Sequence, residues 1–463
     1  MLNNAKYFFG RSLLREEFPD QIQPIKEESK VQSVKLIGDK VICQRCGSEI
    51  AKDNVCLRVK QLYYCDRCLV MGRASTKDSL YRFAQKKEPR RRVNLTWEGQ
   101  LTSAQARISK NLIRAYRHKK NHLVHAVTGA GKTEMLFPLI KRVLSDGKQI
   151  AIASPRVDVC LELYPRLKAA FVEEEITLLY GGAEEVYRYS PLILCTTHQL
   201  LRFYHAFDVI VIDEVDSFPY AGDAALFYGT KQAKKRNGVL FFLTATPSDE
   251  ILAYLEETNG RISCLNRRFH GVDLPVPKYY WVWNLTEKMY QNKIPVPLMK
   301  LLSESSRQLL LFFPSINLME KYCQTLRQTF PHKRIMSVHA ADEEREKKVI
   351  MMREEKIDWL LTTTILERGV TFPNIDVIII QAEHRVYTTA SLVQISGRVG
   401  RSPLYPTGIV AFVHSGKSRA MKAAVTQIKK MNRGVYEDGM LIMSSAAQLS
   451  FKLEKFIFKK TIY

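Results

Sequence analysis

The sequence predicts an α/β protein with two tandem domains, each built on a parallel sheet, behind a small zinc-binding N-terminal region. Three observations predict this fold class. The chain has 463 residues, which is too long for a single core. Short β-branched runs alternate with longer amphipathic segments in two blocks, and two CxxC pairs precede the first block. We therefore expect domains at residues 1–92, 93–270 and 271–463.

The charge of the chain indicates its class of partner. Lys and Arg total 70 against 47 Asp and Glu, a net charge of +23. This surplus favours a polyanionic partner, nucleic acid ahead of an anionic membrane surface. A soluble lysine-rich protein without such a partner is the alternative. No stretch approaches the roughly 18 apolar residues of a membrane span, and we find no secretory signal. We therefore expect no transmembrane segment, a cytoplasmic protein, and cysteines that are reduced or metal-bound.

The N-terminal region holds five of the nine cysteines, and its 20 basic side chains outnumber 11 acidic ones. Cys43 and Cys46 form one CxxC pair, Cys65 and Cys68 form another, and 18 residues separate the pairs. Two thiolates from each tight turn would complete a tetrahedron around zinc, and Gly47 suits the first turn. Four protein ligands leave no open position, so the predicted site is structural. Four free thiols are the alternative.

The first block opens with an apolar, strand-like run that leads into a glycine-rich loop and a helical segment. This context is that of a phosphate-binding loop, although Ala126 stands where GxxxxGK[ST] has its first glycine. The glycines let backbone amides approach phosphate oxygens, Lys132 would hold the β- and γ-phosphates, and Thr133 would bind magnesium. The predicted nucleotide-binding residues are Thr128, Gly129, Ala130, Gly131, Lys132 and Thr133.

An acidic pair follows a second buried strand. The apolar run Val209–Ile212 ends in the tetrapeptide Asp213–Asp216. Downstream of a phosphate loop, this arrangement suits a magnesium ligand, Asp213, followed by a base that activates water, Glu214. A solvated acidic loop is the alternative.

The strand–helix alternation resumes after a proline-rich stretch from Pro275 to Pro297. Here the run QISGRVGR carries Arg398 and Arg401, which we place on one face of a helix because they are three residues apart. Such arginines can stabilise charge on a transferred phosphoryl group. Surface or DNA-phosphate arginines are the alternative. Together with the loop and the acidic pair, they predict an ATP hydrolase.

These residues resemble the motor of superfamily 2 helicases over about residues 95–415. The resemblance implies two RecA-like domains, adenine contact through Gln105 and nucleotide contact through Gln394. It also makes Thr197, Thr364 and Arg368 candidates for gripping a nucleic-acid backbone. That superfamily often has alanine first in its phosphate loop. The matching segments are Leu101–Gln105, Ala126–Thr133, Ser154–Arg156, Thr196–His198, Asp213–Asp216, Thr244–Thr246, Thr362–Thr371 and Gln394–Arg401.

A narrower resemblance covers nearly the whole chain. The cysteine pairs followed by AGKTEMLFP, LYGG, CTTHQLLR, DEVDSFPY, TTTILERGVT and LVQISGRVGR look like the ComFA family of late-competence DNA-uptake ATPases. Similarity to the PriA helicase is more distant. The resemblance implies an ATP-driven motor on single-stranded DNA that drives uptake of transforming DNA at the inner face of the cytoplasmic membrane. The implied partners are the uptake channel, a phosphoribosyltransferase-like competence protein and a strand-loading recombination mediator.

Other functions remain as alternatives. An RNA helicase and a replication-restart DNA helicase are the enzyme alternatives, and DEVD in place of DEAD favours DNA. The non-enzyme alternative is a zinc-stapled DNA-binding scaffold with an ATP switch, against which Glu214 and both arginines argue. The basic run Lys86–Arg92 is either a solvated linker or a site for DNA or a partner. The 415–463 tail is either a helix on the second domain or a membrane-surface contact.

Overall fold

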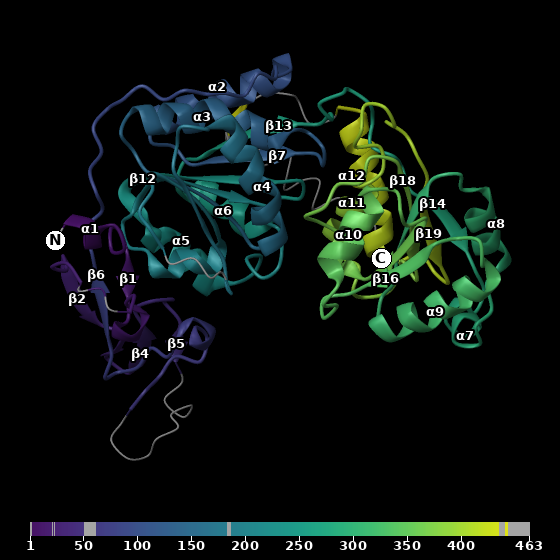
Figure 1. Cartoon of the computed structure of the whole chain (residues 1–463), viewed down its shortest axis with the longest axis horizontal. Coiled ribbons are helices and arrows are strands. Elements are labelled where there is room, and N and C mark those ends of the chain that lie inside the picture. Colours follow the sequence, from purple (N-terminus) through teal and green to yellow (C-terminus); the bar gives the residue numbers. More distant parts are fainter. Residues whose placement is uncertain are drawn as a thin grey trace. The chain divides into compact units, whose positions relative to one another are not determined.

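The computed structural model describes residues 2–20, 22, 24–50, 62–182, 187–434 and 440–442. The chain folds into two compact units (Figure 1). The first contains Met1–His125, Thr133–Ser263 and strand β20, and the second contains Ala126–Lys132 and the described residues from Cys264 to Gly434. The predicted N-terminal region therefore belongs to the first unit.

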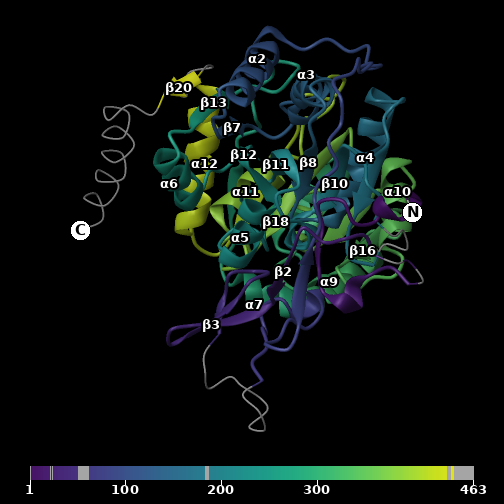
Figure 2. The ribbon, with the colours of Figure 1, turned by 90° about the vertical axis from the view of Figure 1, so that its left-hand side faces the viewer.

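The first unit is built on an eight-stranded sheet in the order β20-β13-β7-β12-β11-β8-β10-β9. The pairs from β7 to β9 are parallel, whereas β20 lies antiparallel beside β13 (Figure 2). All residues of β8 and β10 are buried, as expected for strands covered on both faces. The strands are β7 (His122–Ala126), β8 (Ile150–Ser154), β9 (Ile176–Leu179), β10 (Leu192–Thr196), β11 (Phe207–Asp213), β12 (Lys234–Thr244), β13 (Arg261–Leu265) and β20 (Met440–Ile442).

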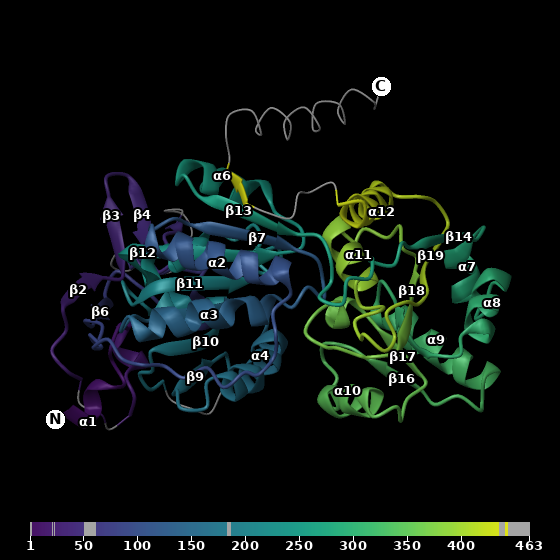
Figure 3. The same ribbon diagram turned by 90° about the horizontal axis from the view of Figure 1, so that it is seen from above.

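Helices cover both faces of this sheet. Figure 3 shows α2 and α3 lying over the strands, and Figure 1 shows α5 below them. Their first turns are fixed by side chains that accept backbone N–H groups: Thr102 caps α2, Asp223 caps α5 and Ser248 caps α6. The helices are α2 (Ser103–Arg117), α3 (Lys132–Ser145), α4 (Val157–Ala170), α5 (Ala224–Ala233), α6 (Asp249–Glu257) and the 3₁₀ helix η4 (Thr197–Arg202).

The second unit has a six-stranded, wholly parallel sheet in the order β14-β19-β18-β15-β17-β16. Its core gathers large apolar side chains such as Tyr322 and Trp359. The strands are β14 (Lys278–Trp281), β15 (Gln308–Phe312), β16 (Ile335–Val338), β17 (Trp359–Thr362), β18 (Ile375–Ile380) and β19 (Val410–His414). The helices are α7 (Leu285–Tyr290), α8 (Val296–Glu304), α9 (Ile316–Thr329), α10 (Arg345–Arg353), η5 (Thr364–Leu366), α11 (Thr389–Ser396) and α12 (Arg419–Asn432).

The N-terminal region forms two small antiparallel sheets, β1-β6-β2 and β3-β4-β5. Its core is small and aromatic, with Phe8 and Phe83 at its centre. Backbone hydrogen bonds join this region to the part of the first unit that contains the eight-stranded sheet. In one of them, the Tyr204 N–H donates to the Gly10 carbonyl at 3.0 Å. The elements are α1 (Leu2–Ala5), β1 (Ser12–Leu13), η1 (Arg15–Glu17), β2 (Ser29–Gln32), β3 (Val34–Ile37), β4 (Lys40–Cys43), β5 (Glu49–Ile50), η3 (Leu69–Met71) and β6 (Ser79–Arg82).

The apolar runs of both blocks form parallel strands, so the predicted α/β class is confirmed. Five strands of these sheets have sequences too polar or too short to stand out: β9, β13, β14, β16 and β20. The basic run is partly tied to the first unit, because the Arg91 guanidinium pairs with the Glu174 carboxylate at 2.6 Å. Most of the 415–463 tail beyond α12 lies outside the described residues.

Gly47 fixes the first cysteine turn against α5, and replacing it should be destabilising. Its φ is +73°, and a Cβ there would lie 2.5 Å from a ring carbon of Tyr228. We expect Gly47→Ala to lower stability by about 2–4 kcal/mol, from left-handed strain plus the clash. Thermal unfolding measures this loss.

Gly38→Ala is the matched control, because Gly38 has φ +58° but no atom within 4 Å of its built Cβ. It should show only the smaller cost of backbone strain. Equal losses in the two variants would mean that the Tyr228 contact contributes nothing.

Candidate nucleotide site and cysteine cluster

The predicted phosphate loop joins β7 to α3. Gly129 and Gly131 have φ values of +77° and +70°, a conformation that favours glycine. Helix α3 begins at Lys132, so the loop ends at a helix N-terminus, where backbone N–H groups attract anions. Thr133 is buried and Lys132 is half-buried. The local strand–loop–helix order is the predicted one.

The acidic pair lies at the carboxyl end of β11. Only β12 separates β11 from β7 in the sheet, and the three strands are parallel. The carboxyl end of β11, which leads into the acidic pair, and that of β7, which leads into the phosphate loop, therefore lie at the same edge of the sheet. Asp213 is the last residue of β11, and its Oδ1 accepts the Glu214 N–H at 2.9 Å. Glu214 has φ +55°, a left-handed conformation that is uncommon for a non-glycine residue and recurs at functional sites.

The last acid of the tetrapeptide links two motifs. Asp216 accepts hydrogen bonds from the hydroxyls of Thr244 at 2.7 Å and Thr246 at 2.5 Å. Thr244 is the last residue of β12, the neighbour of β11 in the sheet, and Thr246 follows it by two residues. The acidic tetrapeptide and the TAT segment are therefore one hydrogen-bonded assembly, and a movement of either segment alone would break these bonds.

Gln105 has a structural role in addition to the predicted one. It is buried, and its Oε1 accepts the Thr102 N–H at 2.8 Å while the Thr102 hydroxyl accepts the Gln105 N–H. This reciprocal capping box starts α2. Adenine contact through Gln105 stays a prediction.

The predicted helical placement of the two arginines is wrong. Helix α11 ends at Ser396, so Arg398 and Arg401 lie in the turn that follows it. Arg398 is 1% exposed, and its Nε donates to the Glu367 carbonyl at 3.1 Å. Arg401 Nη1 donates to the Thr371 hydroxyl at 3.3 Å. Both arginines thus contact the segment resembling motif V, because the glycines of GRVGR end the helix and turn the chain back. Gln394 is buried on α11.

The three residues predicted to grip a strand differ in exposure. Thr197, at the start of η4, is fully buried. Arg368 is also buried, at 3% exposure, and Thr364 is half-buried. The Thr197 side chain is therefore closed off from the surface in this structure.

The four predicted zinc ligands come together in one cluster. All four cysteines are buried, and their sulfur atoms lie within 4.8 Å of one another. The Cys43–Cys68 Sγ distance is 3.7 Å and the Cys46–Cys65 distance is 3.5 Å. Tetrahedral zinc with Zn–S bonds of about 2.3 Å needs sulfurs roughly 3.8 Å apart, so these thiols fit the ion. Cys56 lies outside the described residues.

Sequence reasoning missed Arg45, which occupies the gap of the first CxxC pair. Its side chain is fully buried, and Nη2 lies 3.3 Å from Cys68 Sγ. Hydrogen bonding with Cys43 and the Arg45 charge lower the pKa of the Cys68 thiol, which favours the thiolate that binds metal. An arginine inside a CxxC gap is the signal that could have identified it.

Comparison with known proteins first defines the class. The DEAD/DEAH box helicase family matches residues 102–253, and the helicase conserved C-terminal domain matches residues 293–403. The structure of S. cerevisiae Dbp5 bound to RNA and ADP BeF3 shares the fold, with a TM-score of 0.54 at 16% identity over 72% of this chain and 91% of that one. The chain is therefore an ATP-dependent, helicase-like motor with two RecA-like domains.

Matches that extend over most of the chain identify its family within this class. The competence protein ComFA N-terminal domain matches residues 3–82. Competence protein ComFA of Streptococcus pneumoniae is 40% identical over 92% of this chain and 98% of its own. The Bacillus subtilis ComFA is 42% identical over 84% of this chain and 85% of its own. This chain belongs to the ComFA family of competence proteins.

Among the residues that the structure describes, no helix is both long and apolar enough to cross a bilayer.

Proposed function

We propose that this protein is an ATP-driven translocase on single-stranded DNA that powers the uptake of transforming DNA across the cytoplasmic membrane. The carrying observation is that the strands leading into the acidic pair and into the phosphate loop end at one edge of a parallel sheet, in a chain 40% identical to ComFA of Streptococcus pneumoniae over 92% of its length. Its net charge of +23 suits a polyanionic track.

The proposed roles follow the chemistry of each group. Lys132 holds the β- and γ-phosphates of ATP, and Thr133 and Asp213 hold magnesium. When bound, magnesium neutralises charge on the phosphate oxygens. Glu214 accepts a proton from the attacking water. Arg398 and Arg401 stabilise charge on the transferred phosphoryl group, which would require them to leave the contacts described above.

The nucleotide itself is positioned by further residues of both helicase domains. Thr128, Gly129, Ala130 and Gly131 present backbone groups to the phosphates. Gln105 contacts adenine, and Gln394 contributes from the second helicase domain. These assignments rest on the matching motif positions.

The cysteine cluster is proposed to hold structural zinc. Four thiols with zinc-like spacing and a buried arginine beside one of them support this assignment. The metal would fold a region whose own apolar core is small.

We also propose that the protein works at the inner face of the membrane. Its proposed partners are the DNA-uptake channel, a phosphoribosyltransferase-like competence protein and a strand-loading recombination mediator. This part rests on family membership alone.

ATP turnover with different nucleic acids tests the proposal. We would measure it with no nucleic acid, single-stranded DNA, duplex DNA and RNA at two salt concentrations. Strong stimulation by single-stranded DNA that weakens at high salt is expected. Lys132→Ala is the control for contaminating ATPases.

The other outcomes separate the alternatives. Stimulation mainly by RNA would indicate an RNA helicase, and strong duplex unwinding would indicate a replication-restart helicase. Binding of ATP without turnover under any condition would indicate a DNA-binding scaffold with an ATP switch.

A further inference from the structure

The segment that follows β13 runs alongside the phosphate loop. β13 is the neighbour of β7 in the sheet, and β7 leads into the loop. The Val127 N–H donates to the Leu265 carbonyl at 3.1 Å, and the Phe269 N–H donates to the Gly129 carbonyl at 3.3 Å. The loop and this segment belong to the same compact unit. The side chains of residues 266–269 therefore lie close to the predicted nucleotide site, although they are outside the helicase motifs.

Arg268 is a buried side chain of this segment and reaches the loop. It is 3% exposed, and its Cγ and Nε would lie 3.7 and 3.8 Å from a Cβ built on Gly129. Its Nη2 donates to the Gly397 carbonyl at 3.2 Å, and its Nη1 donates to the Gly400 carbonyl. Arg268 therefore joins the phosphate loop to the turn formed by residues 397–401, here called the arginine turn, which carries both predicted catalytic arginines.

Two buried polar groups at this contact have no hydrogen-bond partner. Arg268 Nε is buried and has no partner among the described residues, and the same is true of the Thr128 hydroxyl in the phosphate loop. The Thr128 side chain lies against the arginine turn, because a Cβ built on Gly397 would collide with the Thr128 hydroxyl. Leaving a buried donor without a partner is costly, so these two groups indicate that a polar ligand binds beside the loop.

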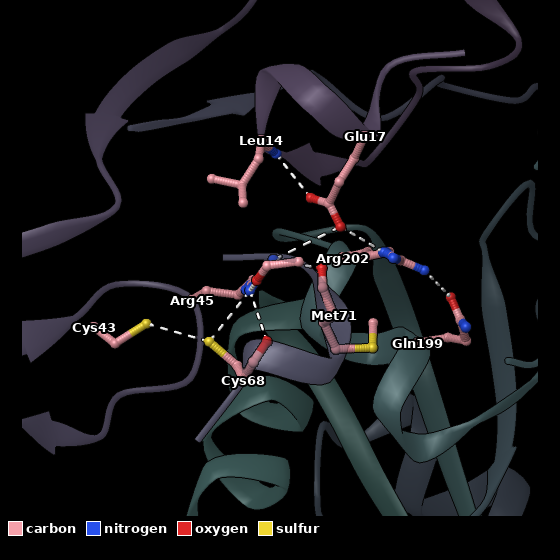
Figure 4. A network of polar contacts seen from close by, with 9 residues as sticks. Leu14, Glu17, Cys43, Arg45, Cys68, Met71, Gln199 and Arg202 are labelled. Atoms are coloured by element: carbon pink, nitrogen blue, oxygen red, sulfur yellow. Dashed lines mark hydrogen bonds and ion pairs between the residues drawn. The ribbon is translucent and has the colours of Figure 1, made fainter. Parts of the chain in front are cut away.

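The charge of Arg268 indicates that this ligand is an anion. Burial, and to a lesser extent the charge of Arg401, lower the pKa of Arg268 to about 9, so its side chain stays protonated at neutral pH. No carboxylate among the described residues pairs with it. Figure 4 shows the contrasting case of Arg45, which is buried but lies 3.3 Å from Cys68 Sγ and 3.7 Å from the Glu17 carboxylate. A buried charge without a counterion is costly, and a phosphate at the loop would supply the missing negative charge.

We propose that Arg268 is a further phosphate-binding residue of the ATP site, with Nε donating to a phosphate oxygen of ATP while Nη1 and Nη2 hold the arginine turn. The guanidinium is planar and rigid, so one side chain can make both sets of contacts in a fixed geometry. Binding of ATP is thereby coupled to the position of the arginine turn. The proposal rests on the proposed ATP site and adds to it a residue outside the helicase motifs.

Nucleotide titration tests the phosphate contact. Binding of a fluorescent, non-hydrolysable ATP analogue with magnesium to the full chain would be measured for each variant. Arg268→Gln should weaken binding roughly 10- to 100-fold, because it removes a hydrogen bond between two charged groups. Arg267→Gln is the matched control, since it makes the same change at the neighbouring, exposed arginine, and it should bind as wild type. An Arg268→Gln variant with the affinity of this control would contradict the contact.

Thermal unfolding distinguishes a ligand contact from a purely structural role. A ligand that binds only the folded protein raises its Tm, and the rise grows with affinity. Arg268→Gln should therefore lose most of the rise that the ATP analogue gives to wild type and to Arg267→Gln. If Arg268→Gln lowers Tm by the same amount with and without the analogue, the side chain only holds the arginine turn, and the proposal is wrong.

Hydrogen exchange tests the coupling to the arginine turn. In wild type, the ATP analogue should slow amide exchange both in the phosphate loop and in peptides that contain residues 397–401. In Arg268→Gln, at an analogue concentration that gives the same occupancy, the loop should still be protected and the arginine turn should not. Equal protection of the turn in the two proteins would contradict the coupling.

Lys132→Ala separates this proposal from the proposed function. If wild type binds the analogue, Lys132→Ala does not, and Arg268→Gln binds normally, the ATP site is supported and the Arg268 contact is wrong. If wild type does not bind the analogue, both proposals fail together. If Arg268→Gln does not fold, Arg268→Lys decides, because it keeps the charge but its single ammonium cannot hold both carbonyls and a phosphate. It should weaken binding roughly 5-fold, and wild-type affinity in this variant would contradict the proposal.

Discussion

Replacing Glu214 by Gln should lower DNA-stimulated ATP turnover by roughly 10²- to 10⁴-fold, the usual contribution of a general base. Glu214 follows the last residue of β11 in a left-handed conformation, which directs the chain out of the sheet at its carboxyl edge. The amide keeps the size of the side chain but cannot accept the proton of the attacking water. Binding of ATP should change little, because the phosphate loop and Lys132 are untouched.

A coupled assay of ATP turnover and a fluorescent-nucleotide titration would measure the two quantities separately. Glu175→Gln is the control, because it makes the same change at an exposed carboxylate of the same unit. It should keep full turnover. If Glu214→Gln keeps the wild-type turnover, another residue must be the general base. If the variant loses nucleotide affinity together with turnover, the substitution has damaged the fold.

The second large effect is expected at the cysteine cluster. Wild type should contain one zinc per chain, and the double variant Cys43→Ser/Cys46→Ser should contain none. The binding of structural zinc contributes about 10–16 kcal/mol to the folding free energy of zinc-finger peptides. Without zinc, this region would depend on its small aromatic core alone for stability. The N-terminal region of the double variant should therefore unfold and become sensitive to protease while the second helicase domain stays resistant.

Metal analysis by mass spectrometry and limited proteolysis would measure these effects. Cys323→Ser is the control, because it removes a buried thiol of the second unit and should leave one zinc per chain. Metal-free wild type, purified without chelator and with the cluster thiols reactive, would mean that the cluster holds no ion.

The strands and local motifs were predictable from the sequence because short-range patterns specify them. Buried parallel strands have sequences rich in β-branched residues, and the apolar runs that precede the phosphate loop and the acidic pair are indeed strands, β7 and β11. The phosphate loop needs φ values that favour glycine, and Gly129 and Gly131 supply them. The two CxxC pairs each form a tight turn, so their spacing predicts that four thiols can share one ion.

The tertiary structure decided the features that depend on contacts distant in sequence. Spacing placed Arg398 and Arg401 on a helix, but α11 ends at Ser396 and both arginines turn back onto the segment resembling motif V. Gln105 matches an adenine-reading position, yet its capping bonds are visible only in the structure. No local pattern predicts that Arg11 and Val70 form one wall of a groove on the first helicase domain. That groove exists because the N-terminal region packs against the ends of strands that lie far along the sequence, and residue periodicity carries no information about such long-range packing.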